Sequence, residues 1–377
     1  MGLEAEHHAE IRAAVRRFAQ QQLLPNAARW DRDREFPREA LQGLGAMGLF
    51  GVTIPEQWGG AGLDHTALAI AAEEIGAGDC SIALIVSVNN IVAKTLEGYA
   101  TDAQKALFLR PLASGQAIAA FALTEPDAGS DAAAITTRAE RHGAHYVLNG
   151  AKQFITSGKN ADFAVVFAVT DKSAGKRGIS AFVVPTATPG YTVARVESKA
   201  GHHASDTAHI ILENCTTEHR LGEEGQGYRI ALANLESGRI NVGAQATGVA
   251  RAALEAAIAY ARERKSMGHV LIDHQAISFR LADMATRVEA ARQLYLHAAQ
   301  LRDAGQPCMK EASMAKLFAT EMAERVCSDA MQIHGGNGYM ADYPVERLWR
   351  DVRVTQIYEG TSDIQRLVIG RVLAAGD

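Results

Sequence analysis

Cysteine is scarce in this sequence, and the few cysteines form no metal-binding pattern. None lies in a CxxC motif or at the Cys/His spacing of a zinc site. The four are Cys80, Cys215, Cys308 and Cys327. We therefore expect reduced, structural thiols and no metal site.

Long apolar runs are also missing. No run approaches the ~20 residues that a helix needs to cross a bilayer, so the sequence predicts no membrane span. The N-terminal stretch MGLEAEHHAEIRAAVRRFA mixes acids, histidines and arginines, and it lacks the apolar centre of a secretory signal. We therefore expect a cytoplasmic protein.

No charge of one sign dominates the chain. The 38 Lys and Arg residues are interleaved with 43 Asp and Glu residues, which gives a formal net charge of −5. Without a basic stripe, nucleic acid is not expected as a partner. The 377 residues exceed the ~100–200 of one domain, so two or three packed units are predicted.

What is present is a change of periodicity along the chain. Residues 1–120 show helical patterns broken by Pro and Gly, residues 121–225 show strand patterns, and residues 226–377 return to long helices. No βαβ unit repeats, and no GxGxxG motif follows a strand, which argues against a dinucleotide-binding fold. The predicted class is α+β, mostly α: an N-terminal helical domain, a small central antiparallel sheet or barrel, and a C-terminal four-helix bundle.

The central strands are predicted from β-branched or alternating runs. These runs are YVLNG from residue 146, FAVVFAV from 163, ISAFVV from 179, YTVARV from 191 and AHIILE from 208. The dipeptides His142-Gly143 and Asn149-Gly150 are typical of hairpin turns. We therefore expect a turn at each of them.

Three C-terminal segments carry the apolar stripes of bundle helices. One is Ala-rich, from Val249 to Ala261. The second passes through Ile277, Leu281, Met284, Val288, Ala291, Tyr295, Ala298 and Leu301, and the third through Met314, Leu317, Phe318, Met322, Val326, Ala330 and Ile333.

The stretches FALTEPDAGSD, from residue 121, and QIYEGTSDIQRLVIGRVL, from residue 356, resemble the most diagnostic motifs of the acyl-CoA dehydrogenase family. Between them lie KQFITSG at 152, ASDTA at 204, ESGR at 236, ERKSMG at 263, DHQAISFRLADMA at 273 and QIHGGNGY at 332, in the order and approximate spacing of that family. The resemblance covers nearly the whole chain. It implies an FAD enzyme that oxidises an acyl-CoA to the trans-2-enoyl-CoA and passes electrons to an electron-transferring flavoprotein.

Glu359 matches the position of the family's usual catalytic base. A carboxylate in an apolar pocket gains basicity by desolvation, as removal of the weakly acidic α-proton requires. The resemblance implies that a ribityl hydroxyl of the flavin and the backbone N–H of Glu359 stabilise the enolate. Some family members place the base on an earlier helix directly before an arginine, but Gly238 precedes Arg239 here.

The resemblance also implies contacts to the flavin and to CoA. The flavin ring and its nearest phosphate are expected to contact Phe121, Leu123, Thr124, Gly129, Ser130, Phe154, Ile155 and Thr156. Residues expected to reach the pyrophosphate, adenine or ribityl group, partly from a neighbouring subunit of a homotetramer, are Arg264, Lys265, Ser266, His274, Gln275, Gln332, Gly335, Gly336, Thr361, Ser362 and Asp363. Substrate contacts are expected from Ser130, Glu236, Arg239 and Gly360.

Two alternatives remain open. The chain could be an acyl-CoA oxidase or a nitroalkane-oxidase-like flavoenzyme, although nitroalkane oxidases typically have Asp at the position of Glu359. It could also be a non-catalytic protein that binds flavin or a CoA thioester. Asn89 and Asn90 fall where the first domain is expected to approach the acyl tail. They indicate a substrate that departs from the plainest fatty acyl group. A short acyl-CoA, with or without a 2-methyl branch, is the first choice, and a medium straight chain is the second.

Overall fold

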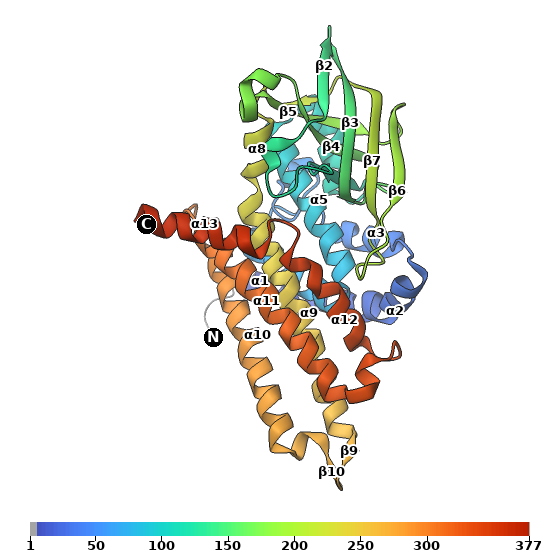
Figure 1. The fold of residues 1–377 in the computed structure, drawn as a ribbon, viewed down its shortest axis with the longest axis vertical. Coiled ribbons are helices and arrows are strands. Elements are labelled where there is room, and N and C mark those ends of the chain that lie inside the picture. The colour runs from blue at the N-terminus through green and yellow to red at the C-terminus, as the bar shows by residue number, and fades with distance from the viewer. Residues whose placement is uncertain (1–5, 377) are drawn as a thin grey trace.

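The computed structural model describes residues 6–376, and it confirms the predicted order of helices, strands and helices (Figure 1). The first helices form one side of the molecule. They are α1 (Glu6–Phe18), α2 (Leu24–Asp33), α3 (Arg38–Ala46), α4 (His65–Gly78), α5 (Cys80–Tyr99), α6 (Asp102–Gln104) and α7 (Arg110–Ala113).

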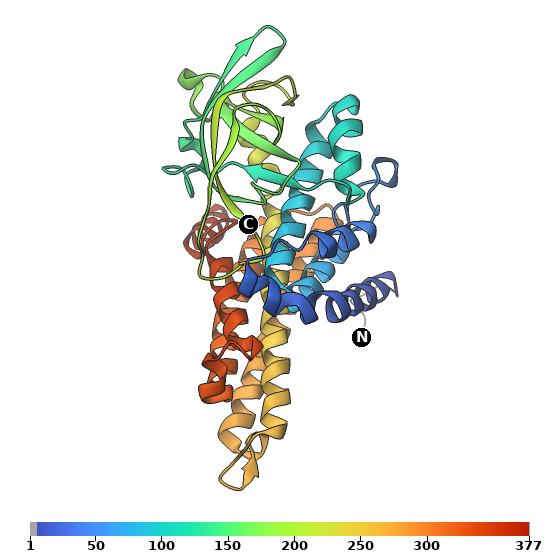
Figure 2. The same cartoon turned by 90° about the vertical axis from the view of Figure 1, so that its right-hand side faces the viewer.

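Helix α5 is long and apolar enough to cross a membrane by length and composition, contrary to the expectation that no such run exists. It is nevertheless a core helix, because 89% of its apolar window is buried inside the protein. Asp79 caps it by accepting from the backbone N–H of Ile82. Figure 2 shows the helix standing beside the sheet.

The middle of the chain forms one eight-stranded sheet with the order β6-β7-β3-β2-β4-β5-β8, and β1 pairs with β4 at its side. The strands are β1 (Ala119–Ala122), β2 (Arg138–His142), β3 (His145–Thr156), β4 (Phe163–Val169), β5 (Ile179–Pro185), β6 (Tyr191–Val196), β7 (Thr207–Thr217) and β8 (Arg220–Leu221). The five predicted runs all lie in strands. The sheet is not purely antiparallel, because β1 runs parallel to β4 and one β2–β4 pair is also parallel.

The two predicted turns have different outcomes. Gly143 has φ +64° and connects β2 to β3, as expected. Asn149-Gly150 is not a turn but lies inside β3, at a shift of register against β7. The glycine is needed there because an added Cβ would meet Thr137 Oγ1 at 2.5 Å.

The C-terminal region is built on three long helices that pack together, and α4 lies against the first of them. Its elements are α8 (Gly227–Ala233), α9 (Leu235–Glu263), the β9–β10 hairpin (Lys265–Ser266 and His269–Val270), α10 (Gln275–Asp303), α11 (Met309–His334), α12 (Pro344–Val352) and α13 (Ser362–Ala375). The predicted stripe of α10 faces the core from Leu281 to Ala298. That of α11 is buried only from Met322 onward, because Phe318 is exposed.

A buried carboxylate ties the N-terminal helices to the bundle. Glu73 of α4 is fully buried and accepts hydrogen bonds from Arg251 of α9 and from Arg292 and Tyr295 of α10. Burial alone would raise its pKa, but these partners lower the pKa of Glu73 to about 2. The carboxylate therefore stays ionised, and it fixes α4 against the two helices that carry part of the site.

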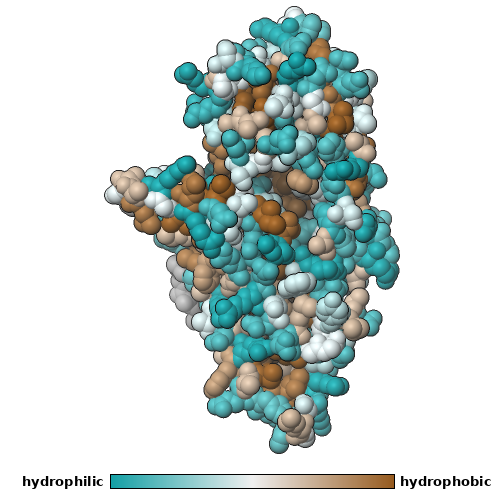
Figure 3. Space-filling model, viewed as in Figure 1, coloured by the Kyte–Doolittle hydropathy of each residue, from teal (hydrophilic) through white to brown (hydrophobic). Residues whose placement is uncertain are grey.

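Exposed apolar side chains gather on the projecting helix and at the lower end of the molecule, among other places on this face (Figure 3). The projecting helix is α13, with Leu367 and Leu373. The lower end is the far end of the long helices, with Met267, Phe279 and Tyr339. Large contiguous apolar patches on a surface are typical of sites that another molecule covers.

Candidate active site

The loop that follows β1 is anchored by a buried ion pair. Lys152 of β3 is fully buried, and its Nζ donates to Glu125 Oε1 at 2.7 Å and to the carbonyl of Leu123 at 3.1 Å. Glu125 also accepts from the backbone N–H groups of Thr136 and Thr137. The 121–130 loop is therefore fixed to the strand that carries Phe154.

These partners alter the ionisation of both groups. Burial lowers the pKa of Lys152 to about 8, although the Glu125 carboxylate opposes the shift. Burial acts to raise the pKa of Glu125, but the Lys152 ammonium and the threonine donors outweigh it and hold that pKa below its usual value. The pair is thus ionised at neutral pH.

Phe154 has the geometry of a ligand-facing aromatic residue. Its side chain is 59% exposed and its φ is +58°, a conformation that non-glycine residues adopt at a cost of about 1–3 kcal/mol. The neighbouring Gln153 N–H donates to the carbonyl of Thr124 at 2.9 Å, which brings Phe154 beside the loop. Ile155 is buried in the sheet.

The rest of the predicted flavin loop divides into packed and open parts. Phe121 and Leu123 are partly buried, and the Phe121 ring lies 4.9 Å from that of Phe167. Gly129 and Ser130 are exposed, and a Cβ added at Gly129 would meet nothing within 4 Å. An open glycine in this loop leaves room for a flat group to lie against the backbone.

Glu359 lies in the loop between α12 and α13, in a left-handed conformation with φ +55°. Its carboxylate rests on Gly238 of α9, because a Cβ added there would meet Glu359 Oε2 at 3.0 Å and Ile91 Cδ1 at 3.5 Å. Two segments far apart in the sequence therefore meet at one carboxylate. No acceptor contacts the backbone N–H of Glu359 in the described part of the chain.

Two buried cations stand near this carboxylate. Burial raises the pKa of Glu359, while Lys316 of α11 and Arg239 of α9 oppose the shift. Burial also lowers the pKa of Lys316, to about 8, and that of Arg239. The arrangement gives a desolvated carboxylate that positive charge keeps available as a base.

The two residues predicted to contact CoA are turned toward different partners. Glu236 pairs with Arg302 of α10 at 2.6 Å. Arg239 is buried and donates to Ser313 Oγ at 3.2 Å, and its Nε has no partner within residues 6–376. The structure therefore does not pair Glu236 with Arg239.

The start of α13 lies directly after Glu359. The Thr361 hydroxyl caps the helix by accepting from the N–H of Ile364, Ser362 Oγ is buried without a partner in the described chain, and Asp363 faces Arg366 at 3.6 Å. Gly360, with φ +88°, accepts at its carbonyl from Lys316 and Gln365.

The remaining predicted flavin contacts lie at the other end of the molecule. Arg264, Lys265 and Ser266 belong to the end of α9 and the β9–β10 hairpin, which Figure 1 shows opposite to the sheet. His274 Nε2 contacts the carbonyl of Ser266 at 3.1 Å, and Gln275 begins α10. Gln332 and Gly335 line a hollow of about 290 Å³, and a Cβ added at Gly336 would meet nothing. One chain therefore does not bring these residues to the Phe154 loop.

Asn89 and Asn90 are buried and cannot serve the acyl tail. The Asn89 amide donates to the carbonyl of Ile85 and accepts from the N–H of Ala119. The Asn90 amide donates to the carbonyls of Leu49 and Val86 and accepts from the N–H of Val52. Their amides fix α5 to β1 and to the 49–52 segment. The expectation that they contact the acyl tail is wrong.

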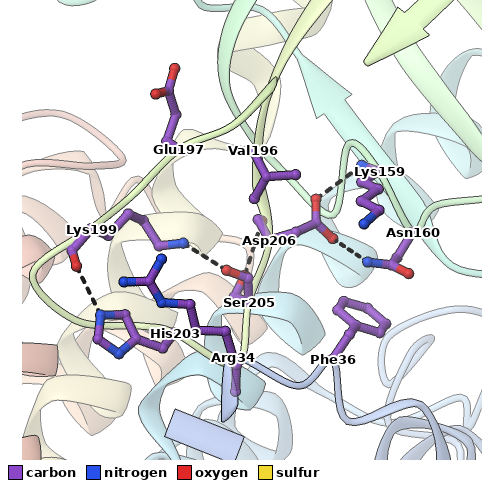
Figure 4. A pocket seen from close by; sticks show the side chains of 11 residues that line it. Arg34, Phe36, Lys159, Asn160, Val196, Glu197, Lys199, His203, Ser205 and Asp206 are labelled. Atoms are coloured by element: carbon purple, nitrogen blue, oxygen red, sulfur yellow. Dashed lines mark hydrogen bonds between the residues drawn. The ribbon is translucent and has the colours of Figure 1, made fainter. Parts of the chain in front are cut away.

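A separate pocket of about 390 Å³ lies between the α2–α3 loop and the ends of β3, β6 and β7 (Figure 4). Within it, Asp206 accepts from the backbone N–H of Lys159 and from Asn160, and Lys199 donates to the carbonyl of Ser205. None of the predicted site residues lines it.

Sequence reasoning missed the residues that hold the site together, namely Glu125, Lys152, Lys316 and Gln365. A charged residue inside a strand or helix pattern is ordinarily taken as solvent-facing, and its burial depends on long-range packing. Glu125 lies within the motif FALTEPDAGSD and Lys152 within KQFITSG. Their opposite charges were the one feature of the sequence that could have indicated a buried ion pair.

The comparisons with known proteins agree with this architecture. Residues 5–116, 120–215 and 225–374 match the N-terminal, middle and C-terminal domains of acyl-CoA dehydrogenase. The chain therefore belongs to the acyl-CoA dehydrogenase family. It is an FAD-dependent oxidoreductase.

Its relatives align over almost the whole chain. An acyl-CoA dehydrogenase of Bacillus subtilis is 47% identical and covers 97% of both chains. The human mitochondrial short-chain specific acyl-CoA dehydrogenase is 46% identical over 97% of this chain and 89% of its own. Among solved structures, the butyryl-CoA dehydrogenase of Megasphaera elsdenii has a TM-score of 0.96 at 39% identity and covers 98% of this chain and 99% of its own.

Proposed function

We propose that this chain oxidises a short-chain acyl-CoA to the trans-2-enoyl-CoA, with Glu359 as the base. The observation that carries the proposal is the Glu359 carboxylate, which is desolvated on Gly238 and faced by Lys316 and Arg239. Domain boundaries at residues 120 and 225, a homotetramer and a cytoplasmic location remain predictions.

The chemistry follows from the position of the base. The Glu359 carboxylate accepts the proton from Cα, and the Cβ hydrogen leaves with its electron pair as the double bond forms. FAD, when bound, supplies the acceptor for that pair. The free N–H of Glu359 is available to donate to the thioester oxygen, and one such donor is worth roughly 3–4 kcal/mol in the transition state.

The flavin site is inferred to be shared between two copies of the chain. The Phe154 face holds the ring, with the open backbone at Gly129 beside it. Arg264 and Gln332 of a second copy reach the pyrophosphate and adenine, since one chain keeps them far from Phe154 (Figure 1). A guanidinium is suited to a pyrophosphate because it donates two parallel hydrogen bonds.

A short acyl chain is supported by the names of similar proteins. Several similar proteins are named short-chain specific acyl-CoA dehydrogenases, and one similar structure is a butyryl-CoA dehydrogenase. Electron-transferring flavoprotein is proposed as the acceptor. A chain from a structural study of that flavoprotein in Acidaminococcus fermentans is 43% identical, with a TM-score of 0.96 and 98% coverage of both chains.

Anaerobic titration with acyl-CoAs from C4 to C16, including 2-methyl-branched members, tests the substrate. We expect the flavin absorbance near 450 nm to bleach most completely with C4 to C6 substrates and to recover slowly in air. Best turnover on C14 or longer would contradict the short-chain assignment. Rapid recovery in air would favour an oxidase, and a prolyl acyl carrier protein oxidase, 34% identical, does share the fold, with a TM-score of 0.93.

Gly238→Ala is expected to lower kcat about 10- to 100-fold while FAD stays bound. The added methyl would stand 3.0 Å from Glu359 Oε2 and displace the carboxylate, and small misplacements of a reacting group have effects of this size. Gly370→Ala in α13, where an added Cβ meets nothing within 4 Å, is the matched control. Equal kcat for both variants would show that the carboxylate does not work from this position.

A further inference from the structure

Lys316 is a buried cation whose ammonium group contacts the backbone on both sides of Glu359. It lies in the N-terminal third of α11 (Met309–His334) and is fully buried, a state that lysine adopts only when its ammonium group is satisfied. Its backbone is also close to α9, since a Cβ added at Gly243 would meet the carbonyl of Ala315 at 3.3 Å and Lys316 N at 3.5 Å. The packing therefore leaves its side chain little freedom.

The ammonium group of Lys316 joins the two ends of the loop that carries the base. Its Nζ donates to the carbonyl of Thr355 and to the carbonyl of Gly360, at 2.9 Å each. Both acceptors are main-chain atoms, and Glu359 lies between them in the sequence. One side chain therefore spans the loop.

The loop needs such support because its backbone is strained. Glu359 has φ +55°, in a region that L-residues seldom occupy, and such conformations persist only where the surroundings impose them. Gln365 of α13 supplies a second donor, with its Nε2 2.8 Å from the carbonyl of Gly360. Gln365 carries no charge, so it can support the geometry only.

Charge is the second contribution of Lys316. The groups that face the Glu359 carboxylate are Arg239 from α9, Lys316 from α11 and Tyr358 from its own loop. Glu236, the nearest other acid to Arg239, is already paired with Arg302. The carbonyls that Lys316 contacts do not neutralise it, so its charge is left to act on Glu359.

We propose that Lys316 is a positioning residue for the dehydrogenation. Its ammonium group holds the 355–360 loop so that the Glu359 carboxylate rests on Gly238, and its charge favours the ionised form of that carboxylate. This inference rests on the proposed role of Glu359. Lys316 of α11 thus acts on the reaction through the 355–360 loop and does not contact the substrate.

Lys316→Met, an unbranched replacement without charge or donor, is the central test on the holoenzyme. We expect kcat to fall about 10- to 100-fold with KM for butyryl-CoA nearly unchanged. We also expect the acid limb of the kcat/KM profile to move up by about one pH unit or more, because an opposite charge beside the carboxylate is lost. Lys310→Met is the matched control, because Lys310 lies on the partly buried first turn of the same helix and pairs with Glu311 at 3.4 Å instead of with the 355–360 loop.

Gln365→Leu separates geometry from charge, since it removes a donor to Gly360 and leaves Lys316 in place. It is expected to lower kcat without moving the acid limb. If Lys316→Met yields no folded holoenzyme, Lys316→Gln takes its place, because it keeps a hydrogen-bond donor but no charge. It is expected to move the acid limb of the kcat/KM profile without lowering kcat.

The outcomes distinguish this inference from the function on which it rests. The role of Lys316 alone would be overturned if Glu359→Gln were inactive while the folded Lys316 variant kept wild-type kcat and an unmoved acid limb. An active Glu359→Gln variant would overturn the base itself. A fall in kcat without any shift of the acid limb in either Lys316 variant would reject the electrostatic role.

Discussion

Replacing Glu359 with Gln is expected to lower kcat/KM by about 10³-fold or more while leaving folded protein with bound FAD. The amide has nearly the shape of the carboxylate but cannot accept the α-proton, and loss of a general base typically costs about 10² to 10⁴ in rate. Stopped-flow bleaching of the flavin by butyryl-CoA measures the chemical step directly.

Glu236→Gln is the matched control for this experiment. It changes a second acid near the start of α9, where the carboxylate is paired with Arg302 at 2.6 Å. The amide can still accept from Arg302, and the charges that act on Glu359 come from Lys316 and Arg239, so most of the turnover is expected to remain. If instead Glu236→Gln were inactive and Glu359→Gln kept near-normal rates, Glu236 would be the base.

The same carboxylate sets the pH dependence. Burial raises the pKa of Glu359 above its ordinary value of 4.5, against the opposing charges of Lys316 and Arg239. Because the base acts only when ionised, kcat/KM is expected to increase as the pH rises through this raised pKa. At pH values below the pKa, kcat/KM is expected to decrease. An acid limb at or below pH 4.5 in the wild-type profile would show that another group limits the rate.

The secondary structure could be predicted where the pattern is local. The run FAVVFAV predicts a strand because it is rich in β-branched and aromatic residues, and it forms β4. The stripe through Leu281 and Val288 predicts the helix α10 because its apolar residues recur at spacings of three and four. The prediction of a hairpin turn at Asn149-Gly150 was wrong because the dipeptide is equally suited to a turn and to a β-bulge, here one packed closely against Thr137.

The organisation of the site depends on contacts that no local pattern contains. The motif around Glu359 predicted a base, but that its carboxylate rests on Gly238 follows only from the packing of the 355–360 loop against α9. Lys316 could not be assigned because its acceptors are backbone carbonyls, which every residue has. Asn89 and Asn90 misled for a related reason: polar residues on an apolar helix can serve the backbone as well as a ligand.

Lys152→Met is expected to release FAD and destabilise the central sheet. It leaves the Glu125 carboxylate buried at 4% exposure without its cation, and breaking a buried pair on one side typically costs about 3–5 kcal/mol. Relieving that penalty requires the 121–130 loop to move, and this loop lies beside Phe154. We therefore expect lost flavin absorbance and a lower unfolding temperature together, measured on the same preparation.

The double variant Glu125→Gln/Lys152→Met separates loss of the loop anchor from loss of a direct flavin contact. It removes both charges, so no buried carboxylate is left unpaired. The introduced amide oxygen can keep the hydrogen bond from the N–H of Thr136, whereas the amide nitrogen replaces the oxygen that accepted from the N–H of Thr137. Stability is expected to recover in part, and flavin binding with it, because the loop no longer has to open. Lys172→Met, at an exposed site of the same region, controls for loss of a lysine. A double variant that regained stability without FAD would mean that Lys152 contributes to flavin binding directly rather than through the loop.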